Sequence, residues 1–268
     1  MLLTVSTRSL QHVKREKEPL APLDIPDFVA EQLGLKGLYV YSSLLKGMGA
    51  KDLERLRDRA DRARCPVLVL VDETPLDFGG EEAAASIARV ERLGLAASKL
   101  GAPAVGLALA ALPQDRFDHY AANVKRSLAS IERFETHLLI RPGDGQAGDP
   151  QRLADLIKKI GGFRIGSMPT FAHAASGDTD DVIRRLCPYA QAVEASVKAF
   201  GKTGKHESWD LVSMLESVRA VGYQNTLCID YAGKTAPVAT IERARDLLSA
   251  VIDPVEEDDE GEGGEDAE

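Results

Sequence analysis

The sequence predicts an α/β protein of one domain, a (β/α)8 TIM barrel followed by a disordered acidic C-terminal tail. Eight apolar segments of strand length alternate with amphipathic helical segments along the chain. The 268 residues suffice for one such barrel, which needs about 250. Because a parallel strand is reached only through a crossover, this alternation indicates a parallel sheet. We place the barrel at residues 1–253 and the tail at 254–268.

The eight predicted strands are runs of five to eight mostly apolar residues. They span 2–6, 37–41, 66–71, 103–109, 136–141, 163–168, 190–197 and 226–230. An open doubly wound sheet would usually carry a glycine-rich phosphate loop after its first strand, and residues 6–9 contain no glycine. The closed barrel is therefore favoured over the open sheet.

Between these strands, apolar residues recur at spacings of three and four, which is typical of helices with one buried stripe. The clearest stripes run over 53–63, 87–100 and 241–251. Two helix starts are predicted from capping residues. One is Asp149 before Pro150, and the other is Ser208 before a helix that begins with Trp209.

The acidity of the chain is concentrated at its end. Asp and Glu outnumber Lys and Arg by 42 to 33, but residues 254–268 hold nine of the acids and no base, which leaves 33 of each in the body. A glycine-interrupted acidic run buries too little apolar surface to offset its ordering entropy, so we expect it to be disordered. Its expected role is solubility, and binding of a basic partner is the alternative.

Composition also excludes several classes of protein. The longest apolar run, 102–112, is shorter than the roughly 20 residues of a membrane span, and the amino terminus does not resemble a signal peptide. No basic stripe interleaved with aromatics suggests nucleic acid as a partner. Three widely spaced cysteines indicate neither a disulfide framework nor a zinc cluster. We expect a soluble, cytoplasmic protein, and the sequence leaves open whether it forms an oligomer.

Polar residues gather where the predicted strands end, which is the working face of a barrel. In strand order they are Ser6 and Arg8, Tyr39 and Tyr41, Asp72 and Glu73, none that is ionisable after the fourth strand, Arg141 and Asp144, Thr170 and His173, Ser196 and Lys198, and Asp230 and Tyr231. We expect many of these side chains to converge on one site. Asp72 and Glu73 are equally well explained as caps of the next helix.

Three segments, taken in order, resemble the xylose isomerase-like superfamily of sugar phosphate isomerases and epimerases, which also includes apurinic endonucleases of the endonuclease IV type. Residues 23–40 are similar to its first helix and second strand, and residues 166–186 to its sixth strand and the helix after it. Residues 227–248 are similar to its closing strand and helix. The resemblance covers nearly the whole body of the chain.

This resemblance implies where a divalent metal would be held, and the residues found there differ from the usual ligands. Members usually place Glu after the fifth strand, Asp three residues before a His after the sixth, His after the seventh and Glu after the eighth. Here these positions hold Arg141, Thr170 before a retained His173, Ser196 before Lys198, and Asp230, while Tyr39 replaces a second-strand Glu.

The substituted positions carry no net charge, so they do not suit a cation. A guanidinium offers no lone pair and would repel a cation about 4 Å away by several kcal/mol at an effective dielectric of roughly 20. We therefore expect no divalent metal and no other cofactor. We expect Arg141 to form an ion pair with Asp230 where the metal would lie, and Lys198 to act as a second cation.

These residues define the predicted site. His173, Asp230 and Lys198 are the candidate catalytic residues, because an imidazole titrates near neutral pH and a carboxylate opposite it can act as partner base. The candidate substrate-binding residues are Arg141, Ser196, Arg8, Thr170 and Tyr39.

The expected function is to act on or bind a small sugar, sugar phosphate or sugar acid at the C-terminal mouth of the barrel without the usual metal. We favour an isomerase, epimerase or lyase. One alternative is a non-catalytic pseudoenzyme or partner subunit of the same fold. Another is a metal-dependent isomerase that recruits Asp72, Glu73 or Asp144 as ligands. An endonuclease is disfavoured because its cluster of metals has no ligands here.

Overall fold

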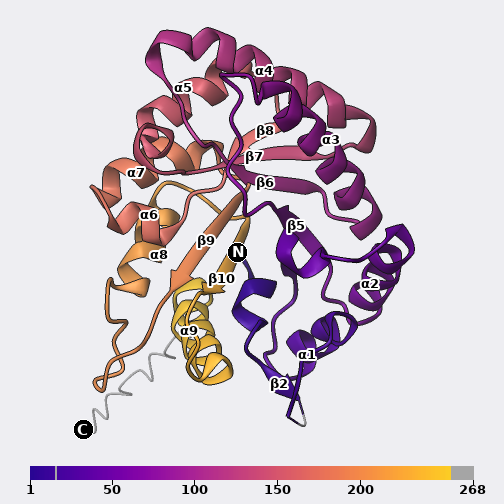
Figure 1. The fold of residues 1–268 in the computed structure, drawn as a ribbon. Coiled ribbons are helices and arrows are strands. Elements are labelled where there is room, and N and C mark those ends of the chain that lie inside the picture. Colours follow the sequence, from indigo (N-terminus) through magenta and orange to yellow (C-terminus); the bar gives the residue numbers. More distant parts are fainter. Residues whose placement is uncertain (16, 255–268) are drawn as a thin grey trace, which may run out of the picture.

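The computed structural model describes residues 1–15 and 17–254, and it confirms the α/β barrel (Figure 1). The predicted acidic tail lies outside the described residues from residue 255 onward, so its boundary stays a prediction. The eight strands of the sheet are parallel to their neighbours and lie in the order β8-β7-β6-β5-β4-β1-β10-β9. They are β1 (Leu2–Ser6), β4 (Leu38–Tyr41), β5 (Val67–Val71), β6 (Ala104–Ala108), β7 (His137–Arg141), β8 (Ile165–Ser167), β9 (Ala192–Val197) and β10 (Thr226–Tyr231).

The two end strands of this order, β8 and β9, close the barrel through single bridges between Ser167 and Ala190 and between Thr170 and Glu194. All eight predicted strands overlap an observed one. β8 is the shortest of the eight at three residues, and Phe163 at the start of its predicted range is 75% exposed and lies outside the sheet.

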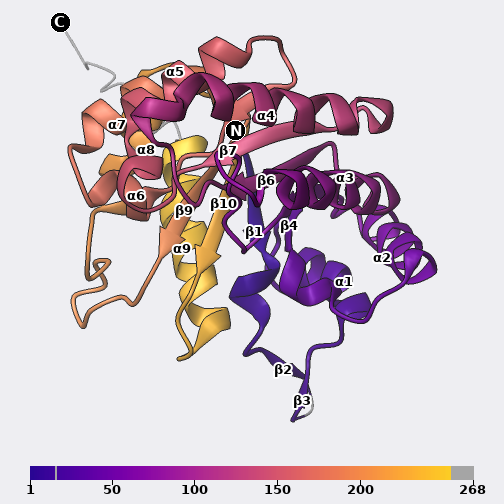
Figure 2. The ribbon, with the colours of Figure 1, turned by 45° about the horizontal axis from the view of Figure 1, so that its top comes forward.

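The helices surround the sheet, as Figures 1 and 2 show from two directions. A small hairpin, β2 (Lys14–Arg15) with β3 (Glu18–Pro19), projects from the loop after β1. Among the described residues, no helix is both long enough and apolar enough to cross a membrane. The helices are α1 (Ile25–Glu31), α2 (Ala50–Arg62), α3 (Ala83–Leu100), α4 (Phe117–Ile131), α5 (Pro150–Ile160), α6 (Phe171–Ala175), α7 (Thr179–Leu186), α8 (Leu211–Ala220) and α9 (Pro237–Ile252).

One of the two predicted helix starts is confirmed and the other is wrong. The Asp149 carboxylate accepts the N–H of Arg152 at 2.8 Å and caps α5. α8 begins at Leu211 rather than at Trp209, because Asp210 caps it by accepting two N–H groups of the first turn at 2.9 and 3.2 Å. Ser208 and Trp209 belong to the preceding loop.

The barrel interior is filled by side chains that alternate along the strands, and a second apolar layer lies between strands and helices. Gly106 makes room in the interior, since a Cβ there would lie 2.8 Å from the sulfur of Met168. All three cysteines are buried and unpaired, and burial raises the pKa of Cys65 and of Cys187 to about 12. The interior of the barrel is thus a packed core.

Candidate functional site

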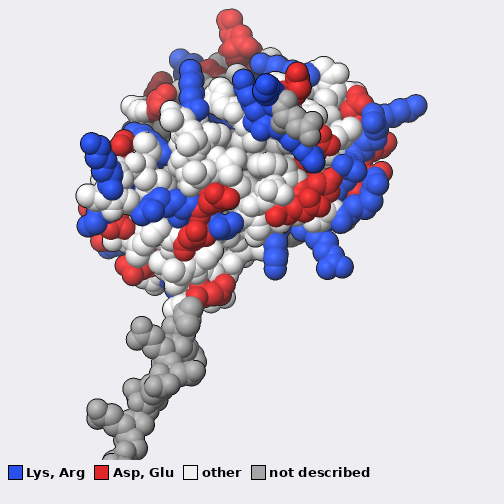
Figure 3. Space-filling model, turned by 90° about the horizontal axis from the view of Figure 1, so that it is seen from below, with Lys and Arg blue, Asp and Glu red and all other residues white. Residues whose placement is uncertain are grey.

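Four charged side chains meet at the carboxyl end of the barrel, and we call them the charge cluster: Arg8, Arg141, Glu194 and Asp230. They come from the short 3-10 helix after β1 (Thr7–Leu10), from β7, from β9 and from β10. Figure 3 shows the face toward which β9 and β10 point, with uncharged residues over much of its centre. The two carboxylates of the cluster are almost fully buried, and only parts of its two arginines reach solvent.

The deeper pair is Arg141 with Glu194. The Nη2 and Nε atoms of Arg141 donate to Oε2 of Glu194 at 2.5 and 3.0 Å. Glu194 is fully buried and the Arg141 side chain is 15% exposed. Burial alone would lower the pKa of Arg141, but the charge of Glu194 raises it, and the net shift is upward. Arg141 therefore stays charged beside its carboxylate at every accessible pH.

Tyr41 joins the two halves of the cluster. Its hydroxyl donates to Oε1 of Glu194, and the Arg8 guanidinium lies 4.6 Å from the centre of its ring. The pKa of the Tyr41 hydroxyl is raised, mainly by burial and secondly by the neighbouring negative charge of Glu194. Tyr41 is consequently a neutral hydrogen-bond donor between two ion pairs.

The outer pair is Arg8 with Asp230. Nε of Arg8 donates to Oδ1 of Asp230 at 3.1 Å, and its Nη2 donates to Oδ2. The Ser6 hydroxyl donates to the same Oδ1 at 2.6 Å. The Asp230 side chain is only 2% exposed, whereas that of Arg8 is 30% exposed. Arg8 is thus the member of the cluster that is most available to a ligand.

The predicted ion pair between Arg141 and Asp230 is wrong, because each residue has a different partner. Glu194, which sequence reasoning missed, lies on β9 two residues before Ser196 and therefore faces the same side of the sheet. Glu194 forms the ion pair with Arg141, and Asp230 forms an ion pair with Arg8. A lone acid inside a buried strand was the available signal, because such a residue is almost never fully buried without a partner.

Thr170, Ser196 and His173 lie around the short helix α6 and not in the cluster. The Thr170 hydroxyl accepts the N–H of His173 at 3.1 Å, and the Ser196 hydroxyl accepts the N–H of Ala172 at 3.2 Å. Both candidate ligand-binding hydroxyls therefore hold backbone groups. Burial lowers the pKa of His173, and within the described residues its Nδ1 is buried without a hydrogen-bond partner and the ring makes no hydrogen bond to Asp230.

Tyr39 lies away from the mouth. It is fully buried, and its hydroxyl is 2.5 Å from Oγ1 of Thr226, the first residue of β10 and hence at the opposite end of the barrel. The structure does not bring Tyr39 to the other predicted substrate-binding residues.

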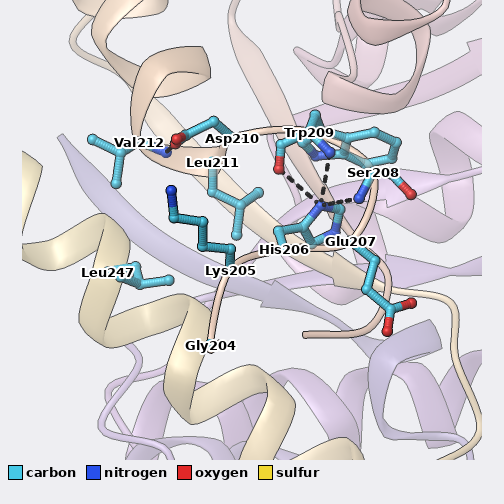
Figure 4. A pocket seen from close by; sticks show the side chains of 10 residues that line it. All are labelled: Gly204, Lys205, His206, Glu207, Ser208, Trp209, Asp210, Leu211, Val212 and Leu247. Atoms are coloured by element: carbon cyan, nitrogen blue, oxygen red, sulfur yellow. Dashed lines mark hydrogen bonds between the residues drawn. The ribbon is translucent and has the colours of Figure 1, made fainter. Parts of the chain in front are cut away.

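Lys198 is exposed and belongs to the loop between β9 and α8. Its ammonium lies 5.2 Å from the Trp209 ring centre, and its backbone N–H donates to Nε2 of His206 at 2.8 Å. His206 in turn lies against the Trp209 ring and hydrogen-bonds the backbone around it (Figure 4). Lys198 is therefore held by this loop, beside the mouth.

The described residues do not assemble a metal-ligand set. Within residues 1–15 and 17–254, no three His, Cys, Asp or Glu side chains come together in a way that could hold a metal ion. Both carboxylates of the charge cluster bond guanidinium groups, and the formal charges of its four members sum to zero.

Comparison with known proteins finds similarity in structure and not in sequence. No protein-family model matches the chain, and no curated protein matches it. An L-ribulose 3-epimerase structure superposes with a TM-score of 0.77 at 14% identity, covering 94% of this chain and 96% of that one. A putative xylose isomerase from Rhodospirillum rubrum gives 0.74 at 15% identity, with 93% and 99% covered.

A D-psicose 3-epimerase structure, determined in the presence of D-fructose, gives a TM-score of 0.71 at 14% identity, with 94% of this chain and 97% of that chain covered. Identities this low establish the fold and leave the activity open. By its fold, this chain is a structural match to the xylose isomerase-like TIM barrel proteins, which include sugar epimerases and isomerases.

Proposed function

We propose that this chain binds a small carbohydrate-type ligand at the carboxyl end of its barrel without a divalent metal ion. The observation that carries the proposal is the charge cluster, in which both buried carboxylates are already bonded to arginines. The shared fold with sugar epimerases supports the class of ligand, and the paired carboxylates support the absence of the metal.

The residues present do not fit a divalent cation. Magnesium and manganese take hard oxygen ligands, and zinc takes nitrogen, sulfur or carboxylate ligands. The two available carboxylates would first have to leave their arginines, and a cation between them would meet two guanidinium charges. At about 4 Å and an effective dielectric of roughly 20, each such repulsion amounts to about 4 kcal/mol per unit of cation charge.

The geometry favours binding over proton transfer. Asp230, one half of the predicted acid–base pair, is bonded by Arg8 and Ser6 and nearly fully buried. His173 lies against the loop that contains Gly148, where a Cβ would come 3.1 Å from its Nε2. Arg8, partly exposed above the ring of Tyr41, offers a ligand hydroxyl or carboxylate charged hydrogen-bond donors.

The test combines metal analysis with ligand binding. We expect elemental analysis of the purified full-length chain to find no stoichiometric divalent metal. A panel of pentoses, hexoses, sugar acids and sugar phosphates is then screened by thermal unfolding with and without EDTA. A ligand at 100 times its dissociation constant should stabilise the protein by about 2.7 kcal/mol.

Arg8→Gln should weaken binding of any ligand that the screen finds, and Lys36→Gln, which removes an exposed charge before β4 at the other end of the barrel, is the matched control. A bound divalent metal at stoichiometric level, or ligand stabilisation abolished by EDTA, would overturn the proposal. If the chain converts a bound sugar and His173→Ala abolishes that conversion, an enzyme becomes the better description of its function.

A further inference from the structure

A groove beside the mouth is lined by cations from two neighbouring loops. It has a volume of about 620 Å³ and lies between the loop after β9 and the loop that joins β10 to α9. The lining residues that matter for its chemistry are Lys198, Phe200, Tyr231, Lys234, Thr235 and Arg243. These loops follow the seventh and eighth strands of the barrel in chain order.

The lining contains three cations and, among the described residues, no Asp or Glu. In the described part of the chain, none of Lys198, Lys234 and Arg243 takes part in any of the salt bridges, whose basic partners are other residues. Among the described residues, no carboxylate therefore forms an ion pair with the cations of the groove. The four formal charges of the charge cluster sum to zero, so the groove and the cluster differ in net charge.

Two of the three cations are held in place without a carboxylate. Nε and Nη2 of Arg243 donate to the carbonyl of Gly204 at 3.0 and 2.8 Å, and its guanidinium lies 5.4 Å from the Phe200 ring centre. The Lys198 ammonium lies against Trp209. Cations positioned by carbonyl and aromatic contacts keep their full charge for an incoming anion.

The backbone also contributes to the positive electrostatic potential of the groove. α9, a helix of 16 residues, begins at the groove with Pro237, and the residue before it, Ala236, provides no side-chain cap. Its first turn contains no acidic residue. The positive end of the helix dipole therefore points to the groove, in addition to the three side chains.

We propose that this groove is an anion subsite that binds the phosphate of a phosphomonoester. The inference rests on the proposed carbohydrate site for the remainder of the ligand, which would extend from the groove toward Arg8. A phosphomonoester carries a charge of about −1.5 to −2 at neutral pH and three acceptor oxygens, which matches cations that approach from two loops. A single carboxylate would leave most of this positive charge uncompensated. Barrels frequently bind phosphate between the loops after the seventh and eighth strands.

The experiment titrates the full chain with inorganic phosphate and, separately, with ribose 5-phosphate and ribose, using calorimetry at low ionic strength. We expect inorganic phosphate to bind, and Lys234→Gln and Arg243→Gln each to weaken that binding about fivefold or more. Lys36→Gln removes the same charge at the other end of the barrel and should leave binding unchanged. Circular dichroism and thermal unfolding establish that each variant is folded.

Each outcome has a defined meaning. Equal phosphate affinity in the wild type, Lys234→Gln and Arg243→Gln would overturn the subsite, as would binding of ribose as tight as that of ribose 5-phosphate. If phosphate binds in the groove but no sugar binds with or without phosphate, the subsite stands and the proposed carbohydrate function fails. If unphosphorylated sugars bind and phosphate does not, the subsite alone fails.

Discussion

Breaking the Arg141–Glu194 pair should cost more stability than removing both partners. Glu194 is fully buried and its carboxylate receives two N–H groups of Arg141, at 2.5 and 3.0 Å, and the Tyr41 hydroxyl. Arg141→Met leaves that carboxylate without its cation, and removing one partner of a buried pair typically costs about 3–5 kcal/mol. We expect the free energy of unfolding to fall by about that amount.

The double variant Arg141→Met with Glu194→Gln should be more stable than the sum of the single effects predicts. Glu194→Gln keeps the shape and neutralises the charge, and the Arg141 side chain, 15% exposed, can be partly hydrated. We expect this single change to cost about 2 kcal/mol and the coupling energy of the cycle to be about 3 kcal/mol, at the upper end of the range for residues in one network, so the double variant should be about 1 kcal/mol more stable than Arg141→Met.

Urea denaturation followed by far-UV circular dichroism measures all four proteins. A parallel cycle with Arg8→Met and Glu194→Gln is the control, because Arg8 bonds Asp230, and its coupling should be clearly smaller. Additive effects in the first cycle, within about 0.5 kcal/mol, would refute the Arg141–Glu194 pairing.

Two further predictions concern the loops around the site. Burial lowers the pKa of His206 below 6.5 in the folded protein. The neutral His206 therefore contributes its full stabilisation above pH 6.5, and this stabilisation is lost as the pH falls through the lowered pKa. His206→Gln should accordingly flatten the decline in the free energy of unfolding between about pH 7 and 5. Gly143→Ala should destabilise by about 1–3 kcal/mol, because its Cβ would lie 2.4 Å from the carbonyl oxygen of Leu109, whereas Gly177→Ala, which meets nothing within 4 Å, should be nearly neutral in thermal unfolding.

The strands were predictable because their patterns are local. Each is a short apolar run with turn residues on both sides, and parallel strands buried on both faces require such runs. The helix start at Asp149 was predictable for the same reason, since the capping residue and the proline are adjacent. The start of α8 was not, because Ser208 and Asp210 are both good caps, and it is Asp210 that accepts the N–H groups of the first turn.

The pairing inside the charge cluster was less predictable, because it depends on which side chains meet across the barrel. Arg141 and Glu194 are 53 residues apart, and Arg8 and Asp230 are 222 residues apart. The family resemblance implies ligands at the ends of the strands, a set that includes Asp230 but not Glu194, which lies in the middle of β9. Tyr39 was expected at the mouth because it replaces a second-strand Glu. Its position in the sequence does not show toward which end of the barrel its side chain points, and its hydroxyl lies beside Thr226 at the start of β10.

The burial of all three cysteines has a practical consequence for studying this protein in solution. A thiol reacts with maleimides as its thiolate, and a pKa of about 12 leaves Cys65 and Cys187 almost entirely protonated at neutral pH. Burial also raises the pKa of Cys228, which is fully enclosed. A single cysteine introduced on the surface, for example at Thr235, would therefore take up a fluorescent label selectively and report on occupancy of the groove without any change to the native thiols.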